Sequence, residues 1–228
     1  LAPGGLEGRS IALTNLTALE ALVYPDLPTG TYACDLATAI AVFQRDLAAG
    51  LVDAWTPGSA YRADFDTAMD GTGRYASVED VLRDMLAGAV VYVDRLRKFK
   101  ILRGLGETAG EARSERTEAV DSGLGLQSLQ VAFQTLADFY ETPYGVFDAA
   151  PDIGGSMDYY MLGEGALSAA EDLALQSASL VEIADADGPE AQALRRMADL
   201  VLFHESFLKT GFTDSIGLTA GFTAADGD

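Results

Sequence analysis

The sequence predicts an all-α fold built of antiparallel helical bundles, and three observations support that prediction. Apolar residues recur at three- and four-residue steps along most of the 228 residues. No segment shows the strict apolar/polar alternation that is typical of a half-buried strand. Long amphipathic segments are joined by short or medium loops, which favours antiparallel packing of neighbouring helices.

The first part of the chain is expected to hold three helices. The first, over about 10–24, ends at Pro25 and would bury Leu13, Leu16, Leu19 and Val23. The second, over about 31–55, carries an apolar stripe that runs from Leu36 to Trp55 and ends before Pro57. The third begins after Ser77, a candidate N-cap with Asp80 three residues on. It ends in a basic cluster over 95–103, whose charge suits a helix C-terminus.

Three further helices are expected after the polar segment 106–122, which is the predicted boundary between the two parts of the chain. They cover about 124–141, 158–183 and 189–209. The last of them follows a cap at Asp187-Gly188 and has Pro189 in its first turn, where proline is well tolerated. The first helical half is therefore placed at residues 1–112 and the second at 113–228.

Composition excludes several classes of function. The chain has 15 Lys and Arg residues against 35 Asp and Glu residues, a formal net charge of −20, so a nucleic-acid partner is not expected. A single His and a single Cys cannot form a Cys/His zinc site, a disulfide framework or a thiol redox pair, and a catalytic triad could use only His204. Chemistry based on carboxylates, hydroxyls and backbone remains open.

No window approaches eighteen uninterrupted apolar residues, and no charged region followed by an apolar run opens the chain. Neither a membrane span nor a retained signal peptide is therefore expected. The chain starts at Leu1, which indicates processing or a piece of something longer.

Two carboxylates fall on apolar helical stripes. Glu20 lies four residues after Leu16 and three before Val23, and Glu205 lies on the stripe of the last helix, with His204 beside it. A buried carboxylate needs a partner, because an unpaired buried charge is costly. Glu20 is thus either hydrogen-bonded within the bundle or a metal-binding or catalytic group, since hard ions such as Ca²⁺, Mg²⁺ or Fe³⁺ accept carboxylate ligands. His204 is either a structural histidine or a further ligand.

Several segments resemble one known family. Residues 15–24, NLTALEALVY, are similar to the G-x-H/P-A-[IL]-E-x-L-[LV]-[FYW] segment of the imelysin family, with Glu20 in place of the family's Glu. The Ala-rich segment that Cys34 opens and Trp55 closes also resembles the family, as do LRGLG at 102–106, the stretch from Glu118 to Leu126 and GFTAADGD at 221–228.

The resemblance implies an all-helical protein with two four-helix-bundle-like halves, exported to the periplasm or held there by a lipid anchor, and linked to iron acquisition. Family members also tend to have further helical residues upstream, so this chain is expected to be either a C-terminal piece of such a protein, with the missing helices as a partner, or a short member. Peptidase-like members carry G-x-H-x-x-E, whereas here Asn15 replaces the Gly and Thr17 replaces the His. Because Thr17 cannot serve as an imidazole ligand, peptidase activity is doubtful.

The leading hypothesis is a periplasmic binding protein for iron or another hard cation, or for heme. It would have no peptidase activity and a membrane transport component as its partner. Its candidate metal ligands are Glu20, Glu118 and Glu205, with His204 as a further candidate and Thr17 as the altered motif position. A second hypothesis is a metal-dependent peptidase or other hydrolase in which Glu20 is the general base. A third is a helical scaffold for protein partners.

Overall fold

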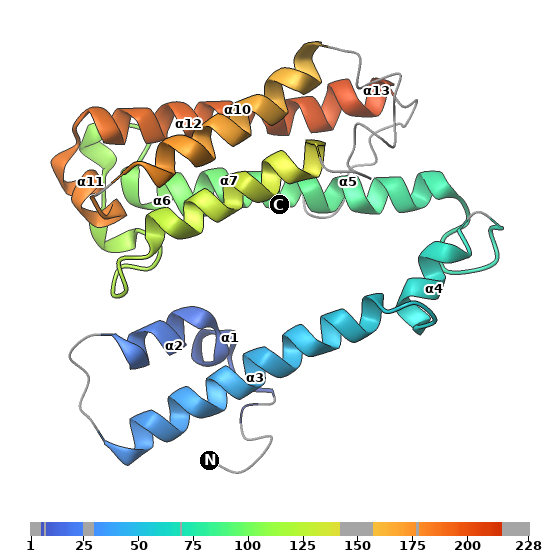
Figure 1. Cartoon of the computed structure of the whole chain (residues 1–228), viewed down its shortest axis with the longest axis horizontal. Helices are drawn as coiled ribbons and strands as arrows, with labels where there is room; N and C mark the ends of the chain where they lie inside the picture. The colour runs from blue at the N-terminus through green and yellow to red at the C-terminus, as the bar shows by residue number, and fades with distance from the viewer. Residues whose placement is uncertain are drawn as a thin grey trace. The chain divides into compact units, whose positions relative to one another are not determined.

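The computed structural model describes residues 6, 8–24, 30–68, 70–141, 157–176 and 178–215 (Figure 1). Every regular element among them is helical, which confirms the predicted all-α class. Contacts divide the chain into two compact units, Leu1–Val81 and Leu82–Asp228. The boundary expected between residues 112 and 113 lies inside the second unit. The division of the chain into halves at that point stays a prediction.

The first unit is built around one long helix. Its helices are α1 (Ile11–Thr14), α2 (Leu16–Val23), α3 (Thr31–Trp55) and α4 (Ala60–Asp66). Both α1 and α2 pack against α3, and Figure 1 shows α2 alongside it. The bounds predicted for α3 are confirmed. A short helix that the sequence interpretation missed, α4, begins where the Ser59 hydroxyl accepts a hydrogen bond from the backbone N–H of Arg62.

The single helix predicted over 10–24 is wrong, because Asn15 divides it. Asn15 has extended backbone angles, and its Oδ1 accepts a hydrogen bond of 2.8 Å from the backbone N–H of Ala18. Asn competes with the backbone in this way and so favours a helix start over a helix interior. Of the side chains expected to be buried here, Leu13, Leu16 and Val23 are exposed and Leu19 is half-buried.

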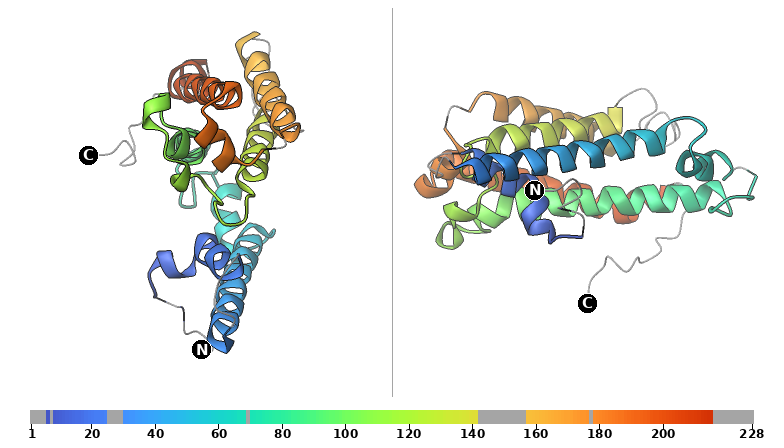
Figure 2. Two further views of the ribbon diagram at one scale, coloured as in Figure 1. Left: turned by 90° about the vertical axis from the view of Figure 1, so that its left-hand side faces the viewer. Right: turned by 90° about the horizontal axis from the view of Figure 1, so that it is seen from below.

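The second unit holds a continuous apolar core. Its long helices are α5 (Val78–Arg95), which starts in the first unit, α7 (Gly125–Glu141), α10 (Met157–Ala174) and α12 (Pro189–Phe207). The shorter α6 (Leu102–Leu105), α11 (Leu180–Ala186) and α13 (Thr213–Ser215) complete the set that the structure describes. Helix α10 returns antiparallel along α7, and the two pack closely (Figures 1 and 2). The buried face of α7 consists of Leu126, Leu129, Phe133, Leu136 and Tyr140.

Two predictions in this unit need correction. The helix expected over 158–183 is two helices, because α10 ends at Ala174 and α11 begins after Ser179, whose side chain and backbone form a capping box with Glu182. Asp187 is not the cap of α12 but the C-cap of α11, where its backbone is left-handed. Its carboxylate forms an ion pair of 2.7 Å with Arg195. The start of α12 at Pro189 is confirmed.

Two π-helical segments continue the long helices of this unit. One, Leu96–Ile101, follows α5, and the other, Leu208–Phe212, follows α12. A π-helical turn inserts an extra residue, so it rotates the side chains after it relative to an uninterrupted α-helix. No described helix is both long enough and apolar enough to cross a membrane.

Candidate functional site

The altered motif lies on α2 in the first unit. Asn15 caps this helix, Thr17 is exposed on its first turn and Glu20 is half-buried one turn later. Residues three apart in a helix share a face, so the Thr17 hydroxyl and the Glu20 carboxylate lie on the same side of α2. This pair offers oxygen ligands and no nitrogen ligand.

Glu118 in the second unit is held by a lysine. Its two carboxylate oxygens accept hydrogen bonds of 2.6 and 2.8 Å from Lys100 Nζ, which lies on the π-helical segment after α5. Ser128 on α7 completes the cluster. Its hydroxyl accepts a hydrogen bond of 2.8 Å from Lys100 Nζ and donates one of 3.2 Å to Glu118. An ion bound at Glu118 would have to compete with the Lys100 ammonium.

Glu205 is likewise paired. On α12 its carboxylate accepts a hydrogen bond of 2.8 Å from Lys209, four residues further on. The Glu205 side chain is half-buried and the Lys209 side chain is exposed. This pair neutralises the carboxylate that interrupts the apolar stripe of α12.

His204 is fully buried beside Tyr140. Its Nδ1 lies 3.1 Å from the Tyr140 hydroxyl, and the two ring centroids are 5.4 Å apart. The other ring nitrogen, Nε2, has no hydrogen-bond partner among the described residues. Burial lowers the pKa of His204 to about 4, so the imidazole is neutral at physiological pH. The described residues place no carboxylate on the ring, as a catalytic triad would require.

The predicted ligands are not assembled into one group within the described residues. These residues contain no set of three or more His, Cys, Asp or Glu side chains placed to share an ion. Glu118 and Glu205 each face a lysine, while Glu20 lies in the other unit. Their role as metal ligands stays a prediction.

The Lys100–Glu118–Ser128 cluster is the polar feature that sequence reasoning missed. Lys100 belongs to the basic cluster over 95–103, which the sequence predicts to complement a helix C-terminus. The structure instead assigns these cations individual partners: Lys98 pairs with Asp94, Arg97 with Glu107 and Lys100 with Glu118. The signal in the sequence is Glu118, an acidic residue of the segment 106–122 that precedes α7.

Comparison with known proteins decides the family. The imelysin peptidase family model matches residues 1–199, well over half of the chain. The chain belongs to the imelysin family. The imelysin match includes the altered motif on α2 and Glu118, and it ends before His204 and Glu205. Neither the curated proteins nor the solved structures include a significant match. The segment 221–228, part of the resemblance, lies outside the residues that the structure describes.

Proposed function

We propose that this imelysin-family protein binds iron or another hard cation in the periplasm as part of iron or heme acquisition, and that it has no peptidase activity. The observation that carries the proposal is Thr17, which stands three residues before Glu20 where the peptidase-like motif has its His. Zinc peptidases bind their ion through imidazole and carboxylate groups and keep one position open for water. A threonine hydroxyl cannot replace the imidazole, so α2 lacks that ligand set.

The chemistry of α2 favours a hard cation over a soft one. Glu20 and Thr17 supply oxygen, which is the ligand type that hard cations prefer. Six or more oxygens surround such ions, so an ion at Glu20 would keep most of its water ligands and bind weakly. The net charge of −20 raises the local concentration of cations. The same charge disfavours heme, whose propionates are negative, so the free cation is the better ligand of the two.

Calorimetric titration with Fe²⁺ under anaerobic conditions, and with ferric nitrilotriacetate, tests the proposal. Glu20→Gln removes one charge from α2 and is expected to weaken binding at least several-fold. The matched control is Glu79→Gln in the first turn of α5, which removes the same charge from an exposed position and should leave the isotherm unchanged. Equal isotherms for Glu20→Gln and the unchanged protein would overturn the proposed ion site.

A cleavage assay addresses catalysis, because the matched family is named as a peptidase family. Incubation with an unfolded protein substrate and added Zn²⁺ should produce no cleavage. Cleavage that chelator abolishes and Glu20→Gln removes would instead establish a hydrolase with Glu20 as general base. Cleavage that survives Glu20→Gln would point to a contaminating protease and leave the proposal standing.

A partner in the membrane is part of the same proposal. A binding protein in acquisition delivers its cargo to a transport component, and the ion loaded at α2 would be the cargo. Transfer of ⁵⁵Fe from the loaded protein to membrane vesicles that carry a transporter, compared with Glu20→Gln, is the corresponding measurement. Equal transfer by both proteins would contradict a role of α2 in delivery.

A further inference from the structure

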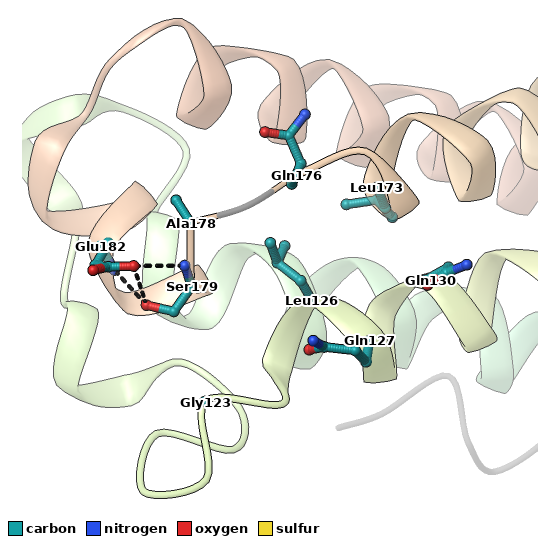
Figure 3. Close-up of a pocket in the computed structure, with 9 residues that line it drawn as sticks. All are labelled: Gly123, Leu126, Gln127, Gln130, Leu173, Gln176, Ala178, Ser179 and Glu182. Carbon is teal, nitrogen blue, oxygen red and sulfur yellow. Dashed lines mark hydrogen bonds between the residues drawn. The ribbon is translucent and has the colours of Figure 1, made fainter.

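A hollow of about 240 Å³ lies in the second unit between the start of α7, the end of α10 and the start of α11. Figure 3 shows Leu126 on α7 opposite Leu173 at the end of α10, with Ser179 and Glu182 at one end. The hollow belongs to none of the features assigned above, and it lies in a different unit from Glu20.

The lining has an apolar floor and an amide rim. Leu126 and Leu173 are almost fully buried and form the floor. Gln127, Gln130 and Gln176 supply the rim. The amides of Gln127 and Gln130 make no hydrogen bond within the described residues, while Gln176 donates only a long one of 3.4 Å to the Asp172 carbonyl. These amide groups are therefore available to a ligand.

Glu182 gives the hollow its charge. Its Oε2 accepts hydrogen bonds from the backbone N–H of Ser179 at 2.7 Å and from the Ser179 hydroxyl at 2.9 Å. These bonds lower the pKa of Glu182, so its carboxylate stays ionised, and they fix its position at the rim. The second oxygen, Oε1, accepts no hydrogen bond from the described residues and can accept one from a ligand.

The lining excludes several classes of ligand. Among the described residues that line the hollow there is no Lys, Arg or His to neutralise an anion. The described lining has no aromatic side chain either, which disfavours planar ligands such as heme and sugars that stack on rings. A single carboxylate is too few ligands for a dedicated metal centre. The volume lies below the usual range of about 300–1,000 Å³ for drug-sized ligands, so the ligand must be small.

We propose that this hollow binds a small aliphatic amine in its ammonium form. The methylene chain would lie on Leu126 and Leu173, where it leaves water. The ammonium has only donors, and the amide oxygens of the rim together with Glu182 are acceptors. The negative charge of the chain as a whole attracts such a ligand as well.

A two-dimensional NMR titration with butane-1,4-diamine at low salt tests the proposal on the whole chain. Shifts are expected for amides of residues 123–130 and 173–182, with saturation in the millimolar range or below. Butane-1,4-diol has the same chain length without charge and is expected to bind at least ten-fold more weakly. Equal binding of the diol and the diamine, or shifts spread over the whole surface, would overturn the proposal.

The variants separate local recognition from overall charge. Glu182→Gln keeps the capping box, which accepts Glu or Gln, and should weaken diamine binding at least five-fold. Glu190→Gln removes the same charge from the exposed first turn of α12 and should leave it unchanged. Gln127→Leu keeps the charge and should also weaken binding. An equal loss in both glutamate variants would show that the overall charge alone attracts the amine, against the proposal.

Discussion

His204 and Tyr140 form a buried polar pair in which the imidazole Nδ1 lies 3.1 Å from the tyrosine hydroxyl. Both side chains are fully buried, and they come from α12 and α7, which are 64 residues apart at this contact. The imidazole Nε2 has no partner among the described residues. The structure thus identifies the only histidine of the sequence as a member of the core, in line with its structural interpretation.

Tyr140→Phe is expected to destabilise the protein by about 1–3 kcal/mol. The change keeps the ring and removes the hydroxyl. His204 Nδ1 then loses its hydrogen bond, so neither nitrogen of the buried imidazole has a partner among the described residues. Urea unfolding followed by circular dichroism measures the difference. Tyr32→Phe on α3 removes a hydroxyl from an exposed ring and serves as the control, with little change expected. A loss no greater than in the control would contradict a stabilising bond.

Acid should weaken the fold through His204. Its pKa is about 4 in the folded protein, against 6.5 for an ordinary histidine, so the unfolded chain binds a proton between these values that the folded chain does not. The contribution of the neutral imidazole is complete above about pH 6.5 and is lost as the pH falls toward 4, by about 3 kcal/mol in total. Unfolding free energies at pH 7 and 4.5 should therefore differ less in His204→Gln than in the unchanged protein. Equal differences would contradict the shifted titration.

Thr17→His should create affinity for Zn²⁺. The substitution restores an imidazole three residues before Glu20, on the same face of α2. Titration with Zn²⁺ is expected to give at least ten-fold tighter binding than in the unchanged protein. Ala48→His adds the same group at an exposed position of α3 whose neighbours three and four residues away, Gln44, Arg45, Leu51 and Val52, include no carboxylate, and it is the matched control. Equal gains in the two variants would show that Glu20 takes no part.

Lys100 and Glu118 should couple more strongly than an exposed ion pair. Their side chains are 28% and 40% exposed, and Ser128 bonds to both, whereas Arg45 and Asp46 on α3 are 70% and 60% exposed. A double-mutant cycle to Ala is expected to give about 1 kcal/mol for the first pair and close to zero for the second. A coupling energy for Lys100 and Glu118 no larger than that of Arg45 and Asp46 would refute the cluster as a stabilising unit.

The bounds of long helices were predictable where apolar periodicity met a clear signal. Pro57 follows α3, and Pro189 opens α12. The breaks at Asn15 and after Ala174 were missed because a side-chain cap there overrides an apolar pattern that continues through it. Periodicity reports which residues share a face and does not report what covers that face.

Burial shows the same limit. The stripes of α3 and α7 are equally regular in the sequence, yet Leu129 and Phe133 on α7 are fully buried while Leu51 on α3 is 65% exposed. A stripe is buried only where another element packs on it, and that depends on contacts far apart in the sequence. The candidate site follows the same rule. Thr17 and Glu20 can be identified from the sequence motif alone. The partners of Lys100 depend on a π-helical turn, which no local sequence pattern predicts.

The uneven distribution of buried side chains has a consequence for motion within each unit. The described part of the first unit buries four apolar side chains, Leu6, Ile40, Ala68 and Tyr75, whereas the second encloses the extended core around α7, α10 and α12. Local opening of a helix costs less free energy where fewer apolar contacts must break. Amide protons of α2 and α3 should therefore exchange with deuterium through small local openings, while those of α7 wait for opening of the whole second unit. The segment that carries Thr17 and Glu20 is thus expected to be less protected than α7, α10 and α12.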